Sequence, residues 1–437
     1  MMDESILGLK YDNGSGVSMG QGFRQITHDR DIRLLHMADL HIGSGMAVSR
    51  RVGREEDLTA ATWMALEKII DLALEQEVDL VTIGGDVFDK VDQQNPRPRM
   101  KLKKAFARLG EIPVALVRGN HDHLTPSVAA IDWPENVKEL NKDYPTLNLG
   151  RICVHGISYH REKQKDDLVP NYPDPVEGRV NIGLLHANVG GQQGHDPYAP
   201  TDVDTLSAKG YQAWLLGHIH QRQVLAETPL ILYPGNIQGR HAGEMGPRTV
   251  ELVTITEDGG ATTEKRRIHA VLWKQIGLDL SEVADDEALL NRINEAIDNE
   301  KAALDSERGL VLRLRLFGAS ELHERLSATR WGKEHETITD LVQESVHEVH
   351  AMGDPFVLID KVQVNTTLSF DIEELCELDD NVLGVIAQMF DDDTLSSEAL
   401  DELRDVGIDI PELDERGEEM WQEAIHGALG RIRGRTD

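Results

Sequence analysis

The sequence is poor in cysteine, in basic residues and in long apolar runs. Its two cysteines, Cys153 and Cys376, are too far apart in the chain to form the spacing of a metal or redox motif. No run approaches the roughly 18 apolar residues that span a bilayer, and the first 30 residues hold no apolar core of signal-peptide length. We therefore expect a cytoplasmic location and no membrane contact, since so few cysteines suit a reducing compartment.

Basic residues are scarce relative to acidic ones, with 45 Lys and Arg against 77 Asp and Glu and a net charge of -32. This balance argues against unaided binding to a polyanion, because affinity for phosphates comes mostly from basic side chains. Only 16 of the basic residues are lysine, a bias often seen in salt-rich cytoplasm, so the acidity could reflect habitat. The stretch "RPRMKLKKAFARLG" at 97–110 is an exception, and as a helix it could face an anionic ligand or be solvated surface.

The length of 437 residues predicts more than one domain, because single cores stop growing at about 250 to 300 residues. Apolar runs alternate with amphipathic stretches, which indicates an α/β fold of packed layers. We expect helices at 57–76 and 97–109. Strands are expected at 32–38, 78–85, 112–119, 180–186, 212–218, 230–235 and 249–255.

From about residue 270 the pattern becomes strand, long helix, strand, which predicts a second, smaller α/β domain. Its strands are expected at 271–280, 309–318 and 356–365, with a helix at 284–304 and a helical stretch ending near 350. The expected organisation is therefore a flexible N-terminal extension at 1–30, a first domain at 31–268, a second at 269–370 and an acidic helical tail at 371–437.

The tail ends in a short predicted helix, 418–433, with an apolar stripe. The stripe consists of Trp421, Ala424, Ile425, Ala428, Leu429 and Ile432, spaced at i, i+3 and i+4. It could pack back onto the second domain, or it could dock in a groove of a partner protein. Both alternatives are open from the sequence.

Polar side chains with metal-ligand chemistry follow five of the predicted strands. They are Asp39 and His41, then Asp86, then Asn120, His121 and Asp122 of "RGNHDH", then His186, and finally His218 and His220. The carboxyl ends of strands in an open α/β sheet line one crevice, where ligands bind. The residues at any one strand end are a weak signal, but the five groups together predict a binding site at one sheet edge.

This mixture of carboxylates and imidazoles indicates a site for two metal ions. One carboxylate can neutralise two divalent cations, and Asp86 suits that bridging role because it stands alone on its turn. Mixed oxygen and imidazole ligation favours Mn, Fe or Zn over Ca. Glycines precede the polar residues and would let the backbone turn sharply and approach a phosphate; they stand at 84, 85, 119 and 217.

The motifs "DLH", "GDVFD", "GNHD", "H" and "GHIH", in this order, resemble those of the calcineurin-like metallophosphoesterases. Longer stretches, "LLHMADLHIG", "GGDVFDK" and "YPGNIQGRH", are similar to the bacterial SbcD-type DNA repair nucleases. "HDPYAPTDVDTLSAKGYQAWLLGHIH" is similar to the YhaO branch of that group. The resemblance covers about residues 31–250 strongly and the rest only in layout.

The resemblance implies a two-layered β-sandwich flanked by helices, the metallophosphoesterase fold, and a role for each motif residue. It makes Asp39, His41, Asp86 and His220 ligands of the first metal, and Asp86, Asn120, His186 and His218 ligands of the second. His121 would be the catalytic proton donor, oriented by Asp122, whereas His123 lies outside the motif and is expected to be a surface turn residue. Asp89 stands where archaeal and eukaryotic relatives carry a histidine, so a second catalytic imidazole is in doubt.

The function implied by the resemblance is a DNA exonuclease or endonuclease in double-strand break repair, with two divalent ions, most simply Mn²⁺. It further implies a homodimer, DNA ends as substrate and an SbcC-like coiled-coil ATPase as partner, for which the tail at 371–437 is the candidate binding segment. The smaller domain at 269–370 is implied to cap the active site and to bind DNA. Two other classes are open. One is a small-molecule phosphatase or cyclic-nucleotide phosphodiesterase, and the other is a non-catalytic scaffold on the same fold.

Overall fold

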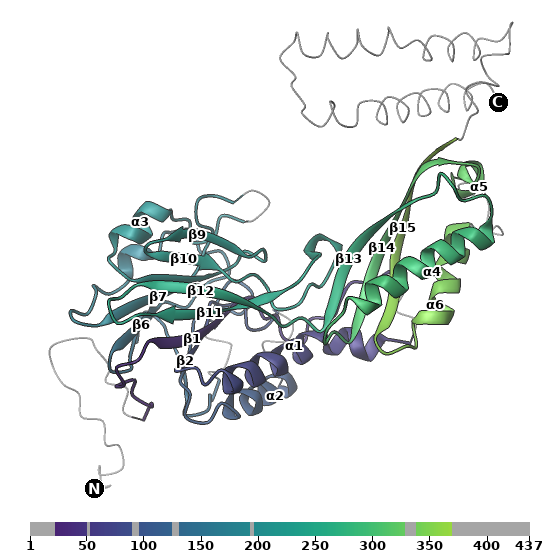
Figure 1. Ribbon diagram of the computed structural model, residues 1–437. Coiled ribbons are helices and arrows are strands. Elements are labelled where there is room, and N and C mark those ends of the chain that lie inside the picture. The colour runs from purple at the N-terminus through teal and green to yellow at the C-terminus, as the bar shows by residue number, and fades with distance from the viewer. Residues whose placement is uncertain are drawn as a thin grey trace, which may run out of the picture. The chain divides into compact units, whose positions relative to one another are not determined.

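The structure is a computed structural model that describes residues 22–49, 53–89, 96–124, 131–192, 196–327 and 338–368 (Figure 1). The described residues form two compact units. The larger comprises 22–47 and 55–272, and the smaller comprises 273–368 together with part of Val48–Arg54. The tail at 371–437, with its predicted stripe from Trp421 to Ile432, lies outside the described residues, as do the first 21 residues of the chain. No helix within the described ranges has both the length and the hydropathy to cross a membrane.

The first sheet of the larger unit has six strands in the order β12-β11-β1-β2-β3-β4. The four strands β1 to β4 run parallel, and β11 pairs antiparallel with both β1 and β12. Their bounds are β1 Ile32–Met37, β2 Leu80–Ile83, β3 Val114–Leu116, β4 Val137–Glu139, β11 Thr249–Ile255 and β12 Ala261–Arg267.

The second sheet also has six strands, in the order β5-β6-β7-β8-β10-β9. The inner strands β6, β7, β8 and β10 run parallel, and the two edge strands pair antiparallel with their neighbours. Their bounds are β5 Thr146–Asn148, β6 Ile152–Gly156, β7 Val180–His186, β8 Ala213–Gly217, β9 Gln223–Glu227 and β10 Leu230–Tyr233.

All seven strands predicted for the first domain are present, as β1, β2, β3, β7, β8, β10 and β11. The hydrophobic pattern of the sequence did not predict β4, β5, β6, β9 and β12. Two of these, β4 and β5, have three residues each, too few to show a period, while β9 and β12 are edge strands with few buried side chains. Short and edge strands owe their pairing to neighbouring strands more than to their own residues.

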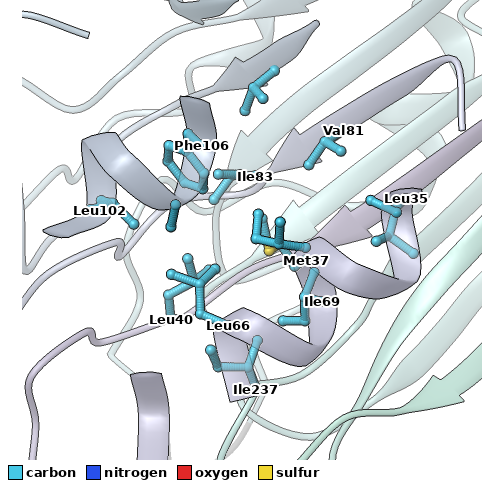
Figure 2. Packing of buried hydrophobic residues seen from close by; sticks show 14 of the residues in the cluster. Leu35, Met37, Leu40, Leu66, Ile69, Val81, Ile83, Leu102, Phe106 and Ile237 are labelled. Atoms are coloured by element: carbon cyan, nitrogen blue, oxygen red, sulfur yellow. The ribbon is translucent and has the colours of Figure 1, made fainter. Parts of the chain in front are cut away.

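Helices cover the outer face of the first sheet. The two helices are α1 Glu55–Glu75 and α2 Pro96–Ala107, each within two residues of the predicted range. Figure 2 shows Leu66 and Ile69 of α1 and Phe106 of α2 beside Met37 and Ile83 of the sheet. Because apolar residues recur along α1 at a helical period, one side of it stays buried over its whole length.

Two further apolar layers complete the sandwich. Between the sheets, Leu34 and Val253 of the first pack with Ile182, Leu184 and Leu215 of the second. On the outer face of the second sheet, buried aromatic residues cover β7, β8 and β10 together with the helix α3 Val203–Ala208 and the 3₁₀ turn η1 Val169–Asn171. These layers confirm the predicted two-layered β-sandwich flanked by helices.

The two sheets approach each other closely at the carboxyl ends of β2 and β8. A Cβ atom on Gly217 would lie 2.2 Å from the carbonyl oxygen of Gly84, so neither residue has room for a side chain. Nearby, Nε2 of buried His36 donates to the carbonyl of Leu216 at 3.0 Å and Nδ1 lies 3.0 Å from Thr82 Oγ1. Burial lowers the pKa of His36 to about 4, so the neutral ring links the two sheets.

The prediction of a single sheet edge was wrong in one respect. The polar residues that follow β1, β2 and β3 belong to the first sheet, whereas His186 ends β7 and His218 follows β8 in the second. Hydrophobic period indicates that a segment is a strand but carries no information on which of two sheets it joins. The site therefore lies where two sheet edges meet.

The smaller unit is a three-stranded sheet in the order β13-β14-β15, with helices (Figure 1). Its strands are β13 Val271–Asp279, β14 Gly309–Ser320 and β15 Phe356–Leu368, and β14 and β15 run parallel. Its helices are α4 Asp286–Ala302, α5 His323–Ser327 and α6 Ile338–His350. Asp285 caps α4 by accepting from the backbone N–H of Ala288 at 2.8 Å. Strands and helices thus alternate in this unit, and each of the three strands overlaps a range expected from the sequence.

We predict that Gly217→Ala lowers the free energy of unfolding by about 1 to 3 kcal/mol, because the new methyl group would overlap the carbonyl group of Gly84, which follows β2. Gly45→Ala is the matched control, since its nearest neighbour would be Thr59 Oγ1 at 4.0 Å. Urea unfolding of both variants measures the difference. Equal stability of the two variants would show that the sheets can separate without cost.

Candidate metal centre

The turns after β1, β2 and β8 hold site residues in unusual backbone conformations. Asp39, His41, Asp86 and His218 have φ angles of 51°, 43°, 50° and 102°, although none is glycine. Such conformations cost free energy and cluster at functional sites. Backbone hydrogen bonds between the turns hold them in place, because His41 N–H donates to the carbonyl of Asp86 and Asp39 N–H to that of Gly85, both at 3.0 Å.

The Nε2 atoms of His41 and His220 face each other. Nδ1 of His41 donates to Asp89 Oδ1 at 2.7 Å, and Nδ1 of His220 donates to Glu244 Oε1 at 2.6 Å. In the neutral rings the lone pairs therefore lie on the two Nε2 atoms, which are 3.3 Å apart, and Asp39 Oδ1 lies 4.0 Å from that of His220. Two lone pairs directed at one point beside a carboxylate fit a shared cation.

His186 repeats this arrangement on the other side of Asp86. Its Nδ1 donates to the carbonyl of Gly84 at 3.0 Å, so Nε2 carries the lone pair. That atom lies 3.0 Å from Asn120 Oδ1 and 3.5 Å from Asp86 Oδ2. Three acceptor atoms thus converge on a second point, which fits a second cation.

Asp86 lies between the two points. It shares one cluster of possible ligand atoms with His41 and His121 and another with Asp39 and His186, and the atoms within each cluster lie within 4.8 Å of one another. His218 belongs to none of the clusters found among the described residues. Its backbone N–H donates to the Asp39 carboxylate at 3.0 Å, and its ring lies 5.2 Å from that of His186.

An open cavity of about 400 Å³ exposes this centre. It is lined by Asp86, Asn120, His121, Asp196, Tyr198, His218 and His220. Burial, and next the charge of Asp86, raise the pKa of Asp39 well above its usual value, and burial raises that of Asp86 to about 6. Burial also lowers the pKa values of His41 and His186 to about 3, which leaves both rings as neutral ligands. Two divalent cations would compensate the buried carboxylates, and the donor set suits Mn, Fe or Zn.

Comparison with known proteins identifies the family. The family described as calcineurin-like phosphoesterase matches residues 32–222, and the middle domain of metallophosphoesterase YhaO matches residues 273–367. A metallophosphoesterase named YhaO from Bacillus subtilis (strain 168) is 34% identical over 276 residues, which cover 61% of this chain and 67% of that protein. This chain belongs to the calcineurin-like metallophosphoesterases.

Two more distant relatives of this metallophosphoesterase carry names from DNA metabolism. DNA double-strand break repair protein Mre11 from Sulfurisphaera tokodaii is 27% identical over 316 residues, covering 66% of this chain and 74% of the relative. A subunit of the nuclease SbcCD from Bacillus subtilis (strain 168) is 22% identical over 300 residues, covering 58% of this chain and 74% of the relative. The predicted membership of the calcineurin-like metallophosphoesterases is confirmed, and with it a centre for two divalent metals.

The carboxylate at the His121 ring is Asp89. Asp89 Oδ1 lies 3.1 Å from His121 Nδ1 and also accepts from His41, so one oxygen serves both rings. Although burial opposes the effect, the hydrogen bonds from His121 and His41 hold the pKa of Asp89 below its usual range. The hydrogen bond with Asp89 raises the pKa of His121.

Asp122, which the family resemblance assigned to orienting His121, has a different set of contacts. Its two carboxylate oxygens accept from the backbone N–H groups of Gly119 and Val87, both at 2.8 Å. Burial, and next the charge of Asp86, raise the pKa of Asp122 to about 7. Asp122 thus joins the loop after β2 to the loop after β3. The contact that orients His121 is made by Asp89, which the sequence analysis considered only as a difference from archaeal and eukaryotic relatives.

Sequence reasoning also missed Glu244 and Arg240. The 3₁₀ turn η2 Ala242–Glu244 places the buried Glu244 carboxylate on His220 Nδ1, and Glu244 also accepts from the backbone N–H of Arg240 at 2.8 Å. The Arg240 guanidinium lies 3.4 Å from Asp89 and 3.8 Å from Glu244. Neither residue follows a predicted strand, so the strand-end criterion could not find them; only the quoted "YPGNIQGRH" included Arg240.

Several basic side chains of α2 and the residues just after it contact partners within the larger unit. Lys101 Nζ lies 4.2 Å above the Trp63 ring, Lys103 pairs with Asp132 at 2.7 Å, and Arg108 pairs with Glu67 and Asp71. These contacts favour a solvated surface helix over a site for an anion. His123 donates to the carbonyl of Asn120 at 3.0 Å and so supports the turn, as its place outside the motif predicts.

We predict that Asp86→Ala loses both metal ions, because its carboxylate lies between the two clusters. Asp39→Ala is the matched control. It removes a carboxylate of similar burial that the resemblance assigns to one ion, so it should lose about one equivalent. The measurement is elemental analysis after loading with Mn²⁺ and desalting. Retention of one ion by Asp86→Ala would assign the bridge to another residue.

We predict that Glu244→Ala weakens Mn²⁺ binding by about 10- to 100-fold, since an acceptor behind a ligating histidine fixes its tautomer and orientation. Calorimetric titration of the metal-free protein measures the change, and thermal melting checks the fold. Glu264→Ala, at an exposed position of β12, is the control and should bind as the wild type does. An unchanged affinity in Glu244→Ala would show that His220 needs no such support.

Proposed function

We propose that this metallophosphoesterase is a DNA nuclease that hydrolyses phosphodiester bonds at DNA ends in double-strand break repair. The observation that carries the proposal is the place of His121. Its ring lines the cavity 4.8 Å from the ring of His41, its Nδ1 is held by Asp89, and its backbone N–H donates to Asp86 at 2.9 Å. A histidine that can give up a proton thus lies on the cavity wall at the metal clusters, which supports the role of proton donor.

The proposed chemistry is attack of water on the phosphorus atom and cleavage of the bond from phosphorus to the sugar oxygen. The two cations, when bound, polarise the phosphate and favour the ionised form of water. His121 gives a proton to the departing sugar oxygen, and the charge of Asp89 favours the protonated ring that this step requires. Asp39, His41, Asp86 and His220 would hold one cation, and Asp86, Asn120, His186 and His218 the other.

DNA as the substrate is supported by the names of the distant relatives, a double-strand break repair protein and part of a nuclease. The second name also supports an assembly, and we propose an SbcC-like coiled-coil ATPase as partner, with the metallophosphoesterase as a homodimer. A small-molecule phosphatase would have less use for a second folded unit of the YhaO type. A non-catalytic scaffold is disfavoured because the predicted ligands and His121 all line or adjoin one centre.

We predict Mn²⁺-dependent cleavage of linear duplex DNA that EDTA abolishes. His121→Asn should keep the metal content and the DNA affinity but slow cleavage by about 10² to 10⁴, the usual contribution of general acid catalysis. The assay compares linear duplex, a single-stranded circle and bis(p-nitrophenyl) phosphate, with metal content measured on the same samples.

His160→Asn, at an exposed histidine of the same unit, is the control and should cleave at the wild-type rate. Loss of metal from His121→Asn would make His121 a ligand, which its distance to His41 and Asp86 also permits. Hydrolysis of the nitrophenyl ester alone, with no DNA cleavage, would favour the small-molecule alternative. Full activity in EDTA would exclude the two-metal chemistry.

A further inference from the structure

The sheet of the smaller unit has one face covered by helices. Helix α6 packs on β15, and α4 joins it through a hydrogen bond at 3.1 Å between Asn294 and His350 (Figure 1). Leu314 and Leu316 of β14 are fully buried, whereas Arg315 between them is exposed. Because side chains alternate between the two faces of a strand, Arg315 belongs to the face opposite the leucines.

We call this second face the open face and define it by Gln275, Arg315, Phe317, Lys361, Gln363 and Asn365. Five of these residues line an open hollow of about 570 Å³, and Arg315 stands in register with Gln363 of the neighbouring strand. Both Arg315 and Lys361 are exposed, and no carboxylate lines the hollow. This is a cationic and amide-rich surface in a chain whose net charge is -32.

Phe317 adds an aromatic ring to the open face. It stands two residues after Arg315 on β14 and in register with Asn365, so it projects to the same side. Its Cε1 atom would lie 3.1 Å from a Cβ on Gly277 of β13, which means that the ring occupies the space over that glycine. The ring is half-buried and thus keeps part of its surface in solvent.

The acidic groups near this sheet are occupied elsewhere. Asp360 pairs with Arg313 at 2.8 Å and accepts from Ser49, and it is buried. Asp279, near the far end of β14 beside Gly318, accepts from the backbone N–H and hydroxyl of Ser281 at 3.0 and 2.7 Å. Asp279 keeps its charge but does not line the hollow, and among the described residues neither Arg315 nor Lys361 forms an ion pair with a carboxylate.

We propose that the open face binds single-stranded DNA. Arg315 and Lys361 contact successive phosphates, an unstacked base stacks on Phe317, and the amides of Gln275, Gln363 and Asn365 donate and accept hydrogen bonds at base edges. A flat sheet that combines basic side chains with an aromatic ring suits single strands, because duplex DNA offers no exposed base face. This inference rests on the proposed nuclease function; it places the DNA binding that the family resemblance implies for the smaller unit on the open face and specifies a single strand as the ligand.

The test measures binding of a fluorescent oligothymidylate by anisotropy, in EDTA so that no cleavage occurs, over a range of salt concentrations. Arg315→Ala/Lys361→Ala should raise Kd at least about tenfold. It should also reduce the slope of log K against log salt by about 1.4, because each of two phosphate contacts on a single strand contributes about 0.7. Phe317→Ala should raise Kd about 5- to 150-fold with the slope unchanged, since stacking is not ionic.

The matched control is Arg292→Ala/Lys301→Ala, which removes two positive charges from α4 on the covered face and should leave Kd unchanged. Circular dichroism and thermal melting, compared with the wild type, verify that each variant is folded. Should the alanine variants misfold, Arg315→Gln/Lys361→Gln and Phe317→Leu remove the same charge and ring with less change in shape.

Several outcomes separate this inference from the nuclease proposal. If the wild type binds and cleaves DNA and the open-face variants do so equally, the inference is overturned and the nuclease proposal stands. Weakened duplex binding with unchanged single-strand binding would refute the assigned ligand. Open-face-dependent binding without any cleavage would support the inference and refute the nuclease. A wild type that binds no oligonucleotide would overturn the inference in any case.

Discussion

The close approach of two sheets at Gly84 and Gly217 is the constraint on which the metal centre depends. Both backbones come within contact distance there, with no space for a Cβ on either strand. A third glycine, Gly119, lies against Asp86 Oδ1 and the His186 ring, where a Cβ would come within 2.3 and 2.6 Å. The sequence predicted that these glycines allow approach to a phosphate. The structure shows that they allow the two sheets and their polar side chains to approach each other.

The ligand geometry depends in turn on acceptors behind the imidazoles. Asp89, Glu244 and the carbonyl of Gly84 each hold one Nδ1–H, and in this way they direct the Nε2 lone pairs of His41, His220 and His186 into the site. Two of these acceptors are joined by Arg240, which lies 3.4 Å from Asp89 and 3.8 Å from Glu244. A guanidinium between two carboxylates limits their repulsion, so both can stay ionised next to a buried site.

The outcome for individual residues shows what a sequence can predict here. Strand-end residues such as Asp39, Asp86 and His186 were found because a buried strand has a recognisable pattern and its last residue opens onto a loop. Glu244 and Asp89 act through contacts with residues 24 and 48 positions away in the chain, and no local pattern encodes such contacts. Asp122 was identified as a functional residue, yet its carboxylate binds backbone N–H groups of two loops. Residue type thus predicted that these positions belong to a functional site, whereas the hydrogen-bond partners of each side chain could be identified only from the structure.

The acidity of the chain is compatible with a polyanionic substrate, because charges act over short distances in salt. At physiological ionic strength the screening length is about 8 Å, so carboxylates spread over the rest of the surface contribute little at a given contact. The interaction energy of a bound phosphate therefore depends mainly on the charges within that distance. At the metal centre two divalent cations would offset the charges of the nearby carboxylates, and on the open face Arg315 and Lys361 stand without a lining carboxylate. A net charge of -32 is therefore compatible with binding of a polyanion at places where cations or basic side chains are concentrated.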